Sequence, residues 1–191
     1  MKSKFRIAIF ASGSGTNAEE IFKYFGNHPS IEIALLLSSN PTAYALARAS
    51  KYGVGTKVFT KPQLHADDEV LSWLKEANVS HIVLAGFLWL IPQNLIDAFP
   101  HHIVNIHPAL LPKHGGKGMY GMKVHEAVKK CGERETGITI HEVNDRYDEG
   151  HILFQAKCKV LPSDTPEHIA DKVHQLEHAN YPRVIEQWIQ R

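Results

Sequence analysis

Short apolar runs alternate with segments of helical periodicity through the first 107 residues, and this alternation constrains the fold more than any other feature of the sequence. The apolar runs lie at residues 6–11, 31–37, 56–59, 81–86 and 102–107. The helical segments between them lie at residues 18–25, 43–52, 66–77 and 92–99. Strands that alternate with helices predict βαβ units joined in a parallel sheet. We therefore predict an α/β fold with a Rossmann-like, open, mostly parallel sheet flanked by helices.

The pattern changes after residue 107. A glycine-rich loop at residues 113–121 precedes a predicted helix at residues 122–131. Two apolar segments at residues 136–143 and 151–160 are then separated by only a few residues, and so short a link favours an antiparallel strand pair. Pro166, which follows three residues able to cap a helix, marks the start of a long final helix.

Length and charge limit the class of protein. A chain of 191 residues predicts a single domain over residues 1–191. The formal net charge is +1 and the basic residues are scattered, which argues against a nucleic-acid partner. No apolar run approaches the roughly 20 residues of a membrane helix, so we expect no membrane partner. The N-terminus lacks the pattern of a signal peptide, and Cys131 and Cys158 are expected to be reduced thiols, which predicts a cytoplasmic protein.

Thirteen histidines raise the question of a metal site. His125 begins a segment that resembles a zinc-protease helix, but Lys129 stands where the second histidine of that motif belongs. None of the other histidines has convincing ligand spacing, so we predict no metal.

The segment SGSGTN, residues 12–17, joins the first predicted strand to the first helix. Backbone N–H groups of such a turn, together with the helix dipole, favour an anion such as phosphate. We predict that Gly15, Thr16 and Asn17 form this cradle, with Ser14 beside them. The segment does not complete a dinucleotide-binding fingerprint or a P-loop. A tight turn before a capped helix is the alternative.

The segment NIHPALLP, residues 105–112, ends a predicted strand with two polar side chains. Asn105 and His107 are two residues apart, so in an extended segment both face the same side. An amide donor beside an imidazole suits a reaction in which a carbonyl becomes an oxyanion. A polar strand end is the alternative. Leu111-Pro112 is a candidate for a cis peptide bond.

The segment NDRYDEG, residues 144–150, adds a carboxylate, Asp148. A carboxylate near His107 is expected to raise the pKa of the imidazole and favour its charged form. An Asn–His–Asp set fits the addition of a nucleophile to a carbonyl. A solvated turn is the alternative, whereas serine hydrolysis is disfavoured because no G-x-S-x-G motif is present.

Five segments in this order and spacing together resemble the phosphoribosylglycinamide formyltransferase family. They are FASGSGTN at residues 10–17, LAGFLWLIP at 84–92, NIHPALLP at 105–112, TGITIHEVNDRYDEGHILFQ at 136–155 and EHANYP at 177–182. The resemblance implies transfer of the formyl group of 10-formyltetrahydrofolate, a co-substrate, to the amine of glycinamide ribonucleotide. The products would be N-formylglycinamide ribonucleotide and tetrahydrofolate, in de novo purine (IMP) biosynthesis.

The resemblance also implies roles for individual residues. Asn105 and His107 would stabilise the tetrahedral oxyanion, and Asp148 would hold His107 in its charged form and assist proton transfer. Thr139 and His141 would support these three residues. The residues implied to bind the ribonucleotide phosphate and ribose are Ser14, Gly15, Thr16, Asn17 and Glu177. The residues implied to line the folate pocket are Phe87, Leu88, Trp89, Leu90, Ile91, Val143, Asn144, Asp145 and Tyr147. The N-terminal part, about residues 1–100, would bind phosphate, and the C-terminal part, about 101–191, would bind folate and carry catalysis.

Three features depart from the family pattern or add to it. Trp89 stands where many relatives have arginine, and His174 where many have a polar amide. In the glycine-rich loop, Lys113 and Lys117 are expected to be free to meet the glutamate tail of a folate. Two other functions stay open: a formyltetrahydrofolate deformylase, in which water replaces the amine, and a non-catalytic ribonucleotide-binding module. The expected partners are small molecules, with the chain a monomer or a homodimer.

Overall fold

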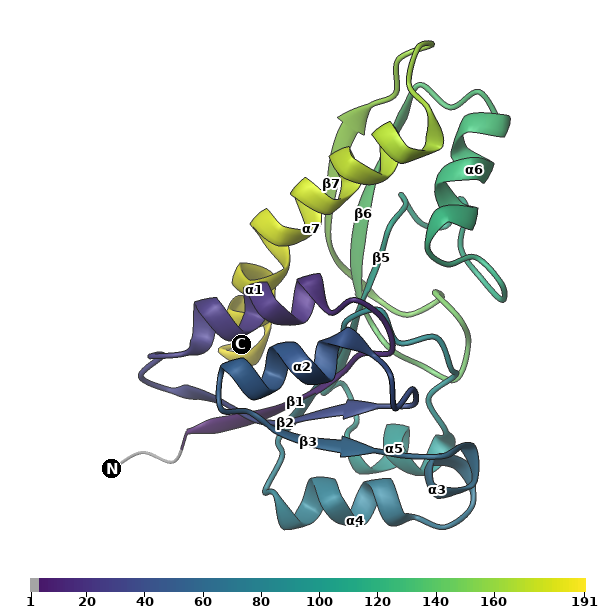
Figure 1. Ribbon diagram of the computed structural model, residues 1–191. Helices are drawn as coiled ribbons and strands as arrows, with labels where there is room; N and C mark the ends of the chain where they lie inside the picture. Colours follow the sequence, from purple (N-terminus) through teal and green to yellow (C-terminus); the bar gives the residue numbers. More distant parts are fainter. Residues whose placement is uncertain (1–3) are drawn as a thin grey trace.

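The structure, a computed structural model, describes residues 4–191 and is built on one seven-stranded sheet (Figure 1). The strands are β1 (Phe5–Phe10), β2 (Ile31–Ser38), β3 (Gly55–Val58), β4 (His81–Leu84), β5 (Ile103–His107), β6 (Glu135–Glu142) and β7 (Ile152–Lys159). Their order is β3-β2-β1-β4-β5-β6-β7. The first five run parallel, and β6 is antiparallel to both β5 and β7. The predicted mostly parallel sheet and antiparallel pair are confirmed.

Seven helices are present among residues 4–191. They are α1 (Thr16–Phe25), α2 (Tyr44–Lys51), α3 (Lys61–His65), α4 (Glu69–Glu76), α5 (Gln93–Ala98), α6 (Met122–Lys130) and α7 (Pro166–Ile189). The predicted helix at residues 66–77 is confirmed as α4, whereas the short helix before it, α3, was not predicted. Thr60 and Gln63 form a capping box at the start of α3, a short-range signal that the apolar periodicity does not reveal.

Two hydrophobic clusters cover the two faces of the sheet. One packs α1, α2, α6 and α7 against the sheet, and the other packs α3, α4 and α5 (Figure 1). β1 serves both clusters, since Ile7 and Ile9 belong to the first while Ala8 and Phe10 belong to the second. This alternation follows from the two-residue period of a strand, and it explains why the strands at the sheet centre read as continuous apolar runs.

The strand order reverses direction at β1, which pairs with β2 on one side and with β4 on the other. In open α/β sheets ligands bind beyond the carboxyl ends of the strands at such a point. Tyr181 of α7 is fully buried there, and its hydroxyl donates to the carbonyl of Leu84, with 2.8 Å between the oxygens. The last helix is thereby fixed beside the carboxyl end of β4. No helix within residues 4–191 is both long and apolar enough to cross a membrane.

Candidate active site

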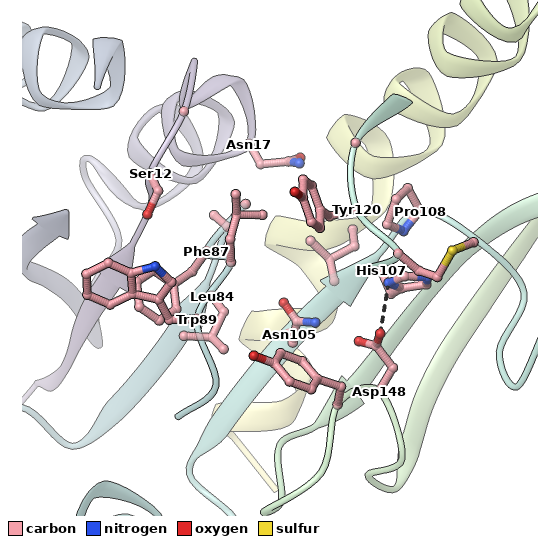
Figure 2. A pocket seen from close by; sticks show the side chains of 18 of the residues that line it. Ser12, Asn17, Leu84, Phe87, Trp89, Asn105, His107, Pro108, Tyr120 and Asp148 are labelled. Atoms are coloured by element: carbon pink, nitrogen blue, oxygen red, sulfur yellow. Dashed lines mark ion pairs between the residues drawn. The ribbon is translucent and has the colours of Figure 1, made fainter. Parts of the chain in front are cut away.

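A cavity of about 600 Å³ opens at the carboxyl ends of β1, β4 and β5 (Figure 2). Its size lies within the range of about 300–1,000 Å³ that is usual for small-molecule sites. Residues 12–17, 84–91, 105–108, 116–121 and 146–148 contribute to its wall, together with His125, His141, Val143, His174 and Glu177. The phosphate-type turn and the Asn–His–Asp set, far apart in the sequence, therefore face one cavity.

The turn after β1 depends on Gly15. Its φ of 73° is left-handed, and a Cβ at this position would lie 2.6 Å from Cα and Cβ of Ala45 in α2. Arg48 of α2 donates from Nε to the carbonyl of Ser14 at 2.9 Å and pairs with Glu19. Within residues 4–191 no side chain caps the N-terminus of α1, so its first N–H groups are available to an anion.

Glu177 meets the same turn from α7. Nδ2 of Asn17 donates to Oε2 of Glu177 at 2.8 Å. Burial raises the pKa of Glu177, and the hydrogen bond from Asn17 opposes that effect only in part. Oδ1 of Asn17 and Nδ1 of His125 are buried without a hydrogen-bond partner among the described residues, and both side chains line the cavity. The five residues predicted to bind the ribonucleotide, Ser14 to Asn17 and Glu177, all line this end of the cavity.

Asn105 is oriented by His141. The two residues are opposite each other in the β5–β6 register. Nδ1 of His141 lies 2.8 Å from the carbonyl oxygen of Glu142, which can only accept, so Nδ1 carries the proton of the neutral ring. Nε2 is then the acceptor for Nδ2 of Asn105, at 3.2 Å. This contact fixes which end of the amide is the donor and leaves its second N–H available to a ligand.

His107 is held between a carbonyl and a carboxylate. Its Nε2 donates to the carbonyl of His114 at 2.8 Å, and its Nδ1 lies 3.5 Å from Oδ2 of Asp148 (Figure 2). Asp148 also accepts from the N–H of Gly116 at 2.9 Å and lies 3.6 Å from Nε2 of His141. Its φ of 59° is left-handed, a conformation that Asp tolerates better than most residues.

The charge state of His107 corrects the sequence-based expectation. Burial lowers the pKa of His107, and although Asp148 and the carbonyl of His114 raise it, the net pKa lies below its ordinary value. Burial raises the pKa of Asp148, but His141, His107 and the amide of Gly116 outweigh burial, so the net pKa is lowered. The expectation considered only the carboxylate, whereas desolvation of the ring has the larger effect. The free protein therefore pairs an ionised Asp148 with a predominantly neutral His107 at neutral pH.

The segments predicted to line a folate pocket divide into two groups. Seven of the nine residues line the cavity: Phe87, Leu88, Trp89, Leu90, Ile91, Val143 and Tyr147. Asn144 and Asp145 are not among the residues that line it. Oδ1 of Asn144 instead accepts from the backbone N–H of Arg146 at 3.0 Å, a local turn contact. Trp89 packs edge-on against Phe59, with ring centroids 6.0 Å apart, so it is a half-buried packing residue at the cavity wall.

The loop after NIHPALLP is held by Thr139, which lies outside the cavity. Its hydroxyl donates to the carbonyl of Ala109 at 2.7 Å and accepts from the N–H of Leu111 at 3.0 Å. The Leu111-Pro112 peptide bond is cis. Lys113 is not free as expected, because its Nζ lies 3.1 Å from both carboxylate oxygens of Glu133, whereas Lys117 does line the cavity.

Several cavity residues were missed from the sequence, among them Met119, Tyr120 and His125. The sequence did contain a signal for His125, because it lies beside Val124 and near Val128, both on the buried face of the predicted helix. A polar side chain on a buried face is unusual and therefore a candidate for function. Burial lowers its pKa to about 4. Within residues 4–191, no group of three or more His, Cys, Asp or Glu side chains is arranged to hold a metal ion.

Comparisons with known proteins agree with the fold. The family model described as Formyl transferase matches residues 5–185. A protein named phosphoribosylglycinamide formyltransferase from Haemophilus influenzae is 34% identical over 94% of this chain and 85% of its own length. A crystal structure of phosphoribosylglycinamide formyltransferase from Bacillus halodurans superposes with a TM-score of 0.86 at 34% identity, covering 97% of this chain and 96% of that one.

The plant relatives are longer than this chain. The chloroplastic phosphoribosylglycinamide formyltransferase from Arabidopsis thaliana is 40% identical over 94% of this chain, which spans 64% of the length of that protein. For the counterpart from Vigna unguiculata, the chain spans 60% of the length. Since the family match covers both the strands and the loops that form the cavity, this chain belongs to the formyl transferase family.

Proposed function

We propose that this protein is a phosphoribosylglycinamide formyltransferase, which transfers the formyl group of 10-formyltetrahydrofolate to the amine of glycinamide ribonucleotide. The observation that carries the proposal is the single cavity that joins the SGSGTN turn to Asn105, His107 and Asp148. A phosphate-bearing substrate bound at residues 14–17, with its ribose at Glu177, would extend its amine toward the Asn–His–Asp set. The apolar wall at residues 87–91, Val143 and Tyr147 would receive the pterin.

The proposed reaction forms one carbon–nitrogen bond and breaks another. The amine attacks the formyl carbon, and the carbonyl electron pair becomes an oxyanion. The second N–H of Asn105 donates to this oxyanion, because His141 already occupies the first. Collapse of the oxyanion restores the carbonyl and breaks the bond to N10 of the folate. Formylated ribonucleotide and tetrahydrofolate leave after one proton has moved from the amine to N10.

His107 and Asp148 are proposed to handle charge and the proton. The contact of His107 Nδ1 with Asp148, at 3.5 Å, is longer than that of Nε2 with the carbonyl, at 2.8 Å. Nδ1 is therefore the nitrogen that can turn toward the oxyanion or a bridging water. A developing negative charge beside the ring favours its protonated form, which offsets the burial that lowers the pKa of His107 in the free protein. Ionised Asp148 would relay the proton through a bridging water.

The test is a spectrophotometric assay with 10-formyltetrahydrofolate, run with and without glycinamide ribonucleotide. We expect loss of the formyl group only when the ribonucleotide is present. Equal loss without it would identify a deformylase, in which water takes the place of the amine. No loss in either case would contradict both enzymes and leave a ribonucleotide-binding module.

The division of labour along the chain is also part of the proposal. The part up to about residue 100 would bind mainly the phosphate, and the part from about residue 101 would carry catalysis. Residues 87–91 and Glu177 cross this division, since the first group borders the proposed folate site and the second faces the phosphate turn. The cytoplasmic location and the monomeric or homodimeric state stay predictions.

A further inference from the structure

We propose that Glu133, at the turn between α6 and β6, is a positioning residue that sets the orientation and tautomer of His107. Glu133 does not line the cavity. It acts through His114, whose side chain it binds and whose carbonyl accepts from His107. That His107 takes part in formyl transfer rests on the proposed function, whereas its orientation in the free protein does not.

Glu133 holds the loop at two consecutive residues. Its Oε1 lies 3.3 Å from Nε2 of His114, and both of its oxygens lie 3.1 Å from Nζ of Lys113. The side chain of His114 is 12% exposed and that of Glu133 is 23% exposed, so their contact is largely shielded, while Lys113 is 66% exposed and adds charge from the rim. Of the two contacts, the one between Glu133 and His114 leads toward His107, because the carbonyl of His114 accepts from that ring.

His114 needs this support because of its backbone. Its φ of 55° is left-handed, a conformation that costs energy in a residue with a Cβ. Such a conformation persists where surrounding contacts fix it. The ring is fixed by Glu133, and the carbonyl of the same residue then meets Nε2 of His107 at 2.8 Å. The backbone of Glu133 is itself anchored to α6, because its N–H donates to the carbonyl of Val128.

The carbonyl of His114 selects the tautomer of His107. A carbonyl can only accept, so the neutral ring keeps its proton on Nε2 and presents a lone pair at Nδ1 to Asp148. Without the carbonyl, Asp148 would favour the opposite tautomer, with the proton on Nδ1. The charged and titratable groups that act on His107 are Asp148 and His114 from two loops, His141 from β6 and His125 from α6. Within residues 4–191, the hydrogen bond at Nε2 of His107 is the one to the backbone carbonyl of His114.

The experiment compares Glu133→Ala with Glu135→Ala in the free protein. Glu135, the first residue of β6, pairs with Lys157 at 3.6 Å rather than with His114, which makes it a matched control. Imidazole nitrogen NMR of the wild type should show the proton of His107 on Nε2 at neutral pH. Glu133→Ala should mix in the Nδ1 tautomer and lower the pKa of His107, because the carbonyl contact favours the charged ring. Glu133→Gln should restore part of the wild-type signal.

A second variant separates positioning from a general loss of structure. His114→Asn tolerates the left-handed backbone and keeps the carbonyl, but it lacks the ring that Glu133 holds, so it should reproduce the tautomer change. In the transfer assay, Glu133→Ala should lower kcat about three- to tenfold, the effect of one lost hydrogen bond, with KM for the ribonucleotide unchanged.

The inference is overturned if Glu133→Ala and His114→Asn leave the His107 signals at their wild-type positions, or if Glu135→Ala shifts them equally. A tautomer change in a protein that shows no transferase activity would support the positioning role while contradicting the proposed function. The two proposals therefore fail separately.

Discussion

Asp148 is the residue on which the proposed chemistry depends most, because it contacts both His107 and His141. Its carboxylate lies 3.5 Å from Nδ1 of His107 and 3.6 Å from Nε2 of His141. Its pKa is lowered despite burial, so it stays charged at neutral pH. Its negative charge raises the pKa of His107 against the burial that lowers it.

Replacing Asp148 with Asn should separate catalysis from binding. Asn tolerates the left-handed backbone at this position but removes the charge, so the pKa of His107 should fall further. We expect formyl transfer to drop by about 10²- to 10⁴-fold, the usual contribution of a positioned proton-transfer group. Binding of glycinamide ribonucleotide, measured by calorimetry, should persist because Asp148 is remote in sequence and role from the 14–17 turn. Transfer near the wild-type rate would show that Asp148 has no catalytic part.

His81 should make stability depend on pH without touching the cavity. It is buried at the start of β4, 4.4 Å from the ring of His102 and 5.0 Å from that of Trp188, and burial followed by the charge of His102 lowers its pKa from 6.5 to about 4. The unfolded chain therefore binds the proton more tightly than the folded one. The contribution of His81 to the free energy of unfolding should be fully present above pH 6.5 and should be lost as the pH falls toward 4. The loss amounts to at most about 3 kcal/mol.

Urea unfolding between pH 7 and pH 4 measures this effect. His81→Asn should make the free energy of unfolding depend less on pH, because the variant has no ring to protonate at this position. The variant should still depend on pH to some degree, since burial also lowers the pKa of His107 and His125. If the pH dependence of the free energy of unfolding were the same in the variant, protonation of His81 would not destabilise the folded protein.

At the scale of elements, the turn between β1 and α1 is shaped by a neighbouring helix. Gly15 lies against Ala45, and Arg48 of the same helix holds the carbonyl of Ser14. The two contacts turn the carbonyl of Ser14 toward α2, so the N–H groups at the start of α1 remain for a ligand. The position of α2, and with it the packing of two βα units, therefore decides whether the turn can cradle a phosphate.

Gly15→Ala should disrupt this turn, whereas Gly13→Ala should not. A Cβ at Gly15 would lie 2.6 Å from Ala45 in a left-handed backbone, while a Cβ at Gly13 would meet nothing within 4 Å. Strain of this kind costs about 1–3 kcal/mol, and each kcal/mol lowers Tm by about 2–4 °C in a domain of this size. Thermal unfolding followed by circular dichroism gives both values, and equal Tm values for the two variants would refute the packing account.

At the scale of the whole molecule, the cavity draws on both ends of the chain. Residues 14–17 from the first βα unit meet Glu177 from the last helix, and residues 87–91 and Tyr147 line the same cavity. A ligand in this cavity therefore contacts segments that lie far apart in the sequence. Binding should stabilise the molecule as a unit.

Glycinamide ribonucleotide and tetrahydrofolate should each raise Tm, and together they should raise it more than either alone. A ligand present at 100 times its Kd contributes about 2.7 kcal/mol, which corresponds to about 5–11 °C at the scaling used above. Thermal shift measurements over a range of ligand concentrations would check this. A rise with the ribonucleotide but none with the folate would contradict the assignment of the apolar wall.

The sequence alone determined the order and type of most elements and the residues at the strand ends. Apolar runs and helical periodicity are local properties, so β1, β4 and the long α7 could be predicted. So could the antiparallel β6–β7 pair, since a short link leaves no room for a crossover. The short α3 was missed because its capping box is a weaker signal than periodicity. Asn105, His107 and Asp148 were chosen correctly as neighbours, because strand ends at one edge of a sheet meet.

Only the tertiary structure decided what surrounds these side chains. His141 lies opposite Asn105 through the β5–β6 register, and Glu133 reaches His114 across about twenty residues of sequence. Asn144 and Asp145 do not line the cavity although Tyr147 does. The pKa of His107 fell where a neighbouring carboxylate alone predicts a rise. Desolvation and long-range contacts depend on every segment that packs around a group. A local sequence pattern therefore cannot give their combined effect on the pKa and the hydrogen bonds of that group.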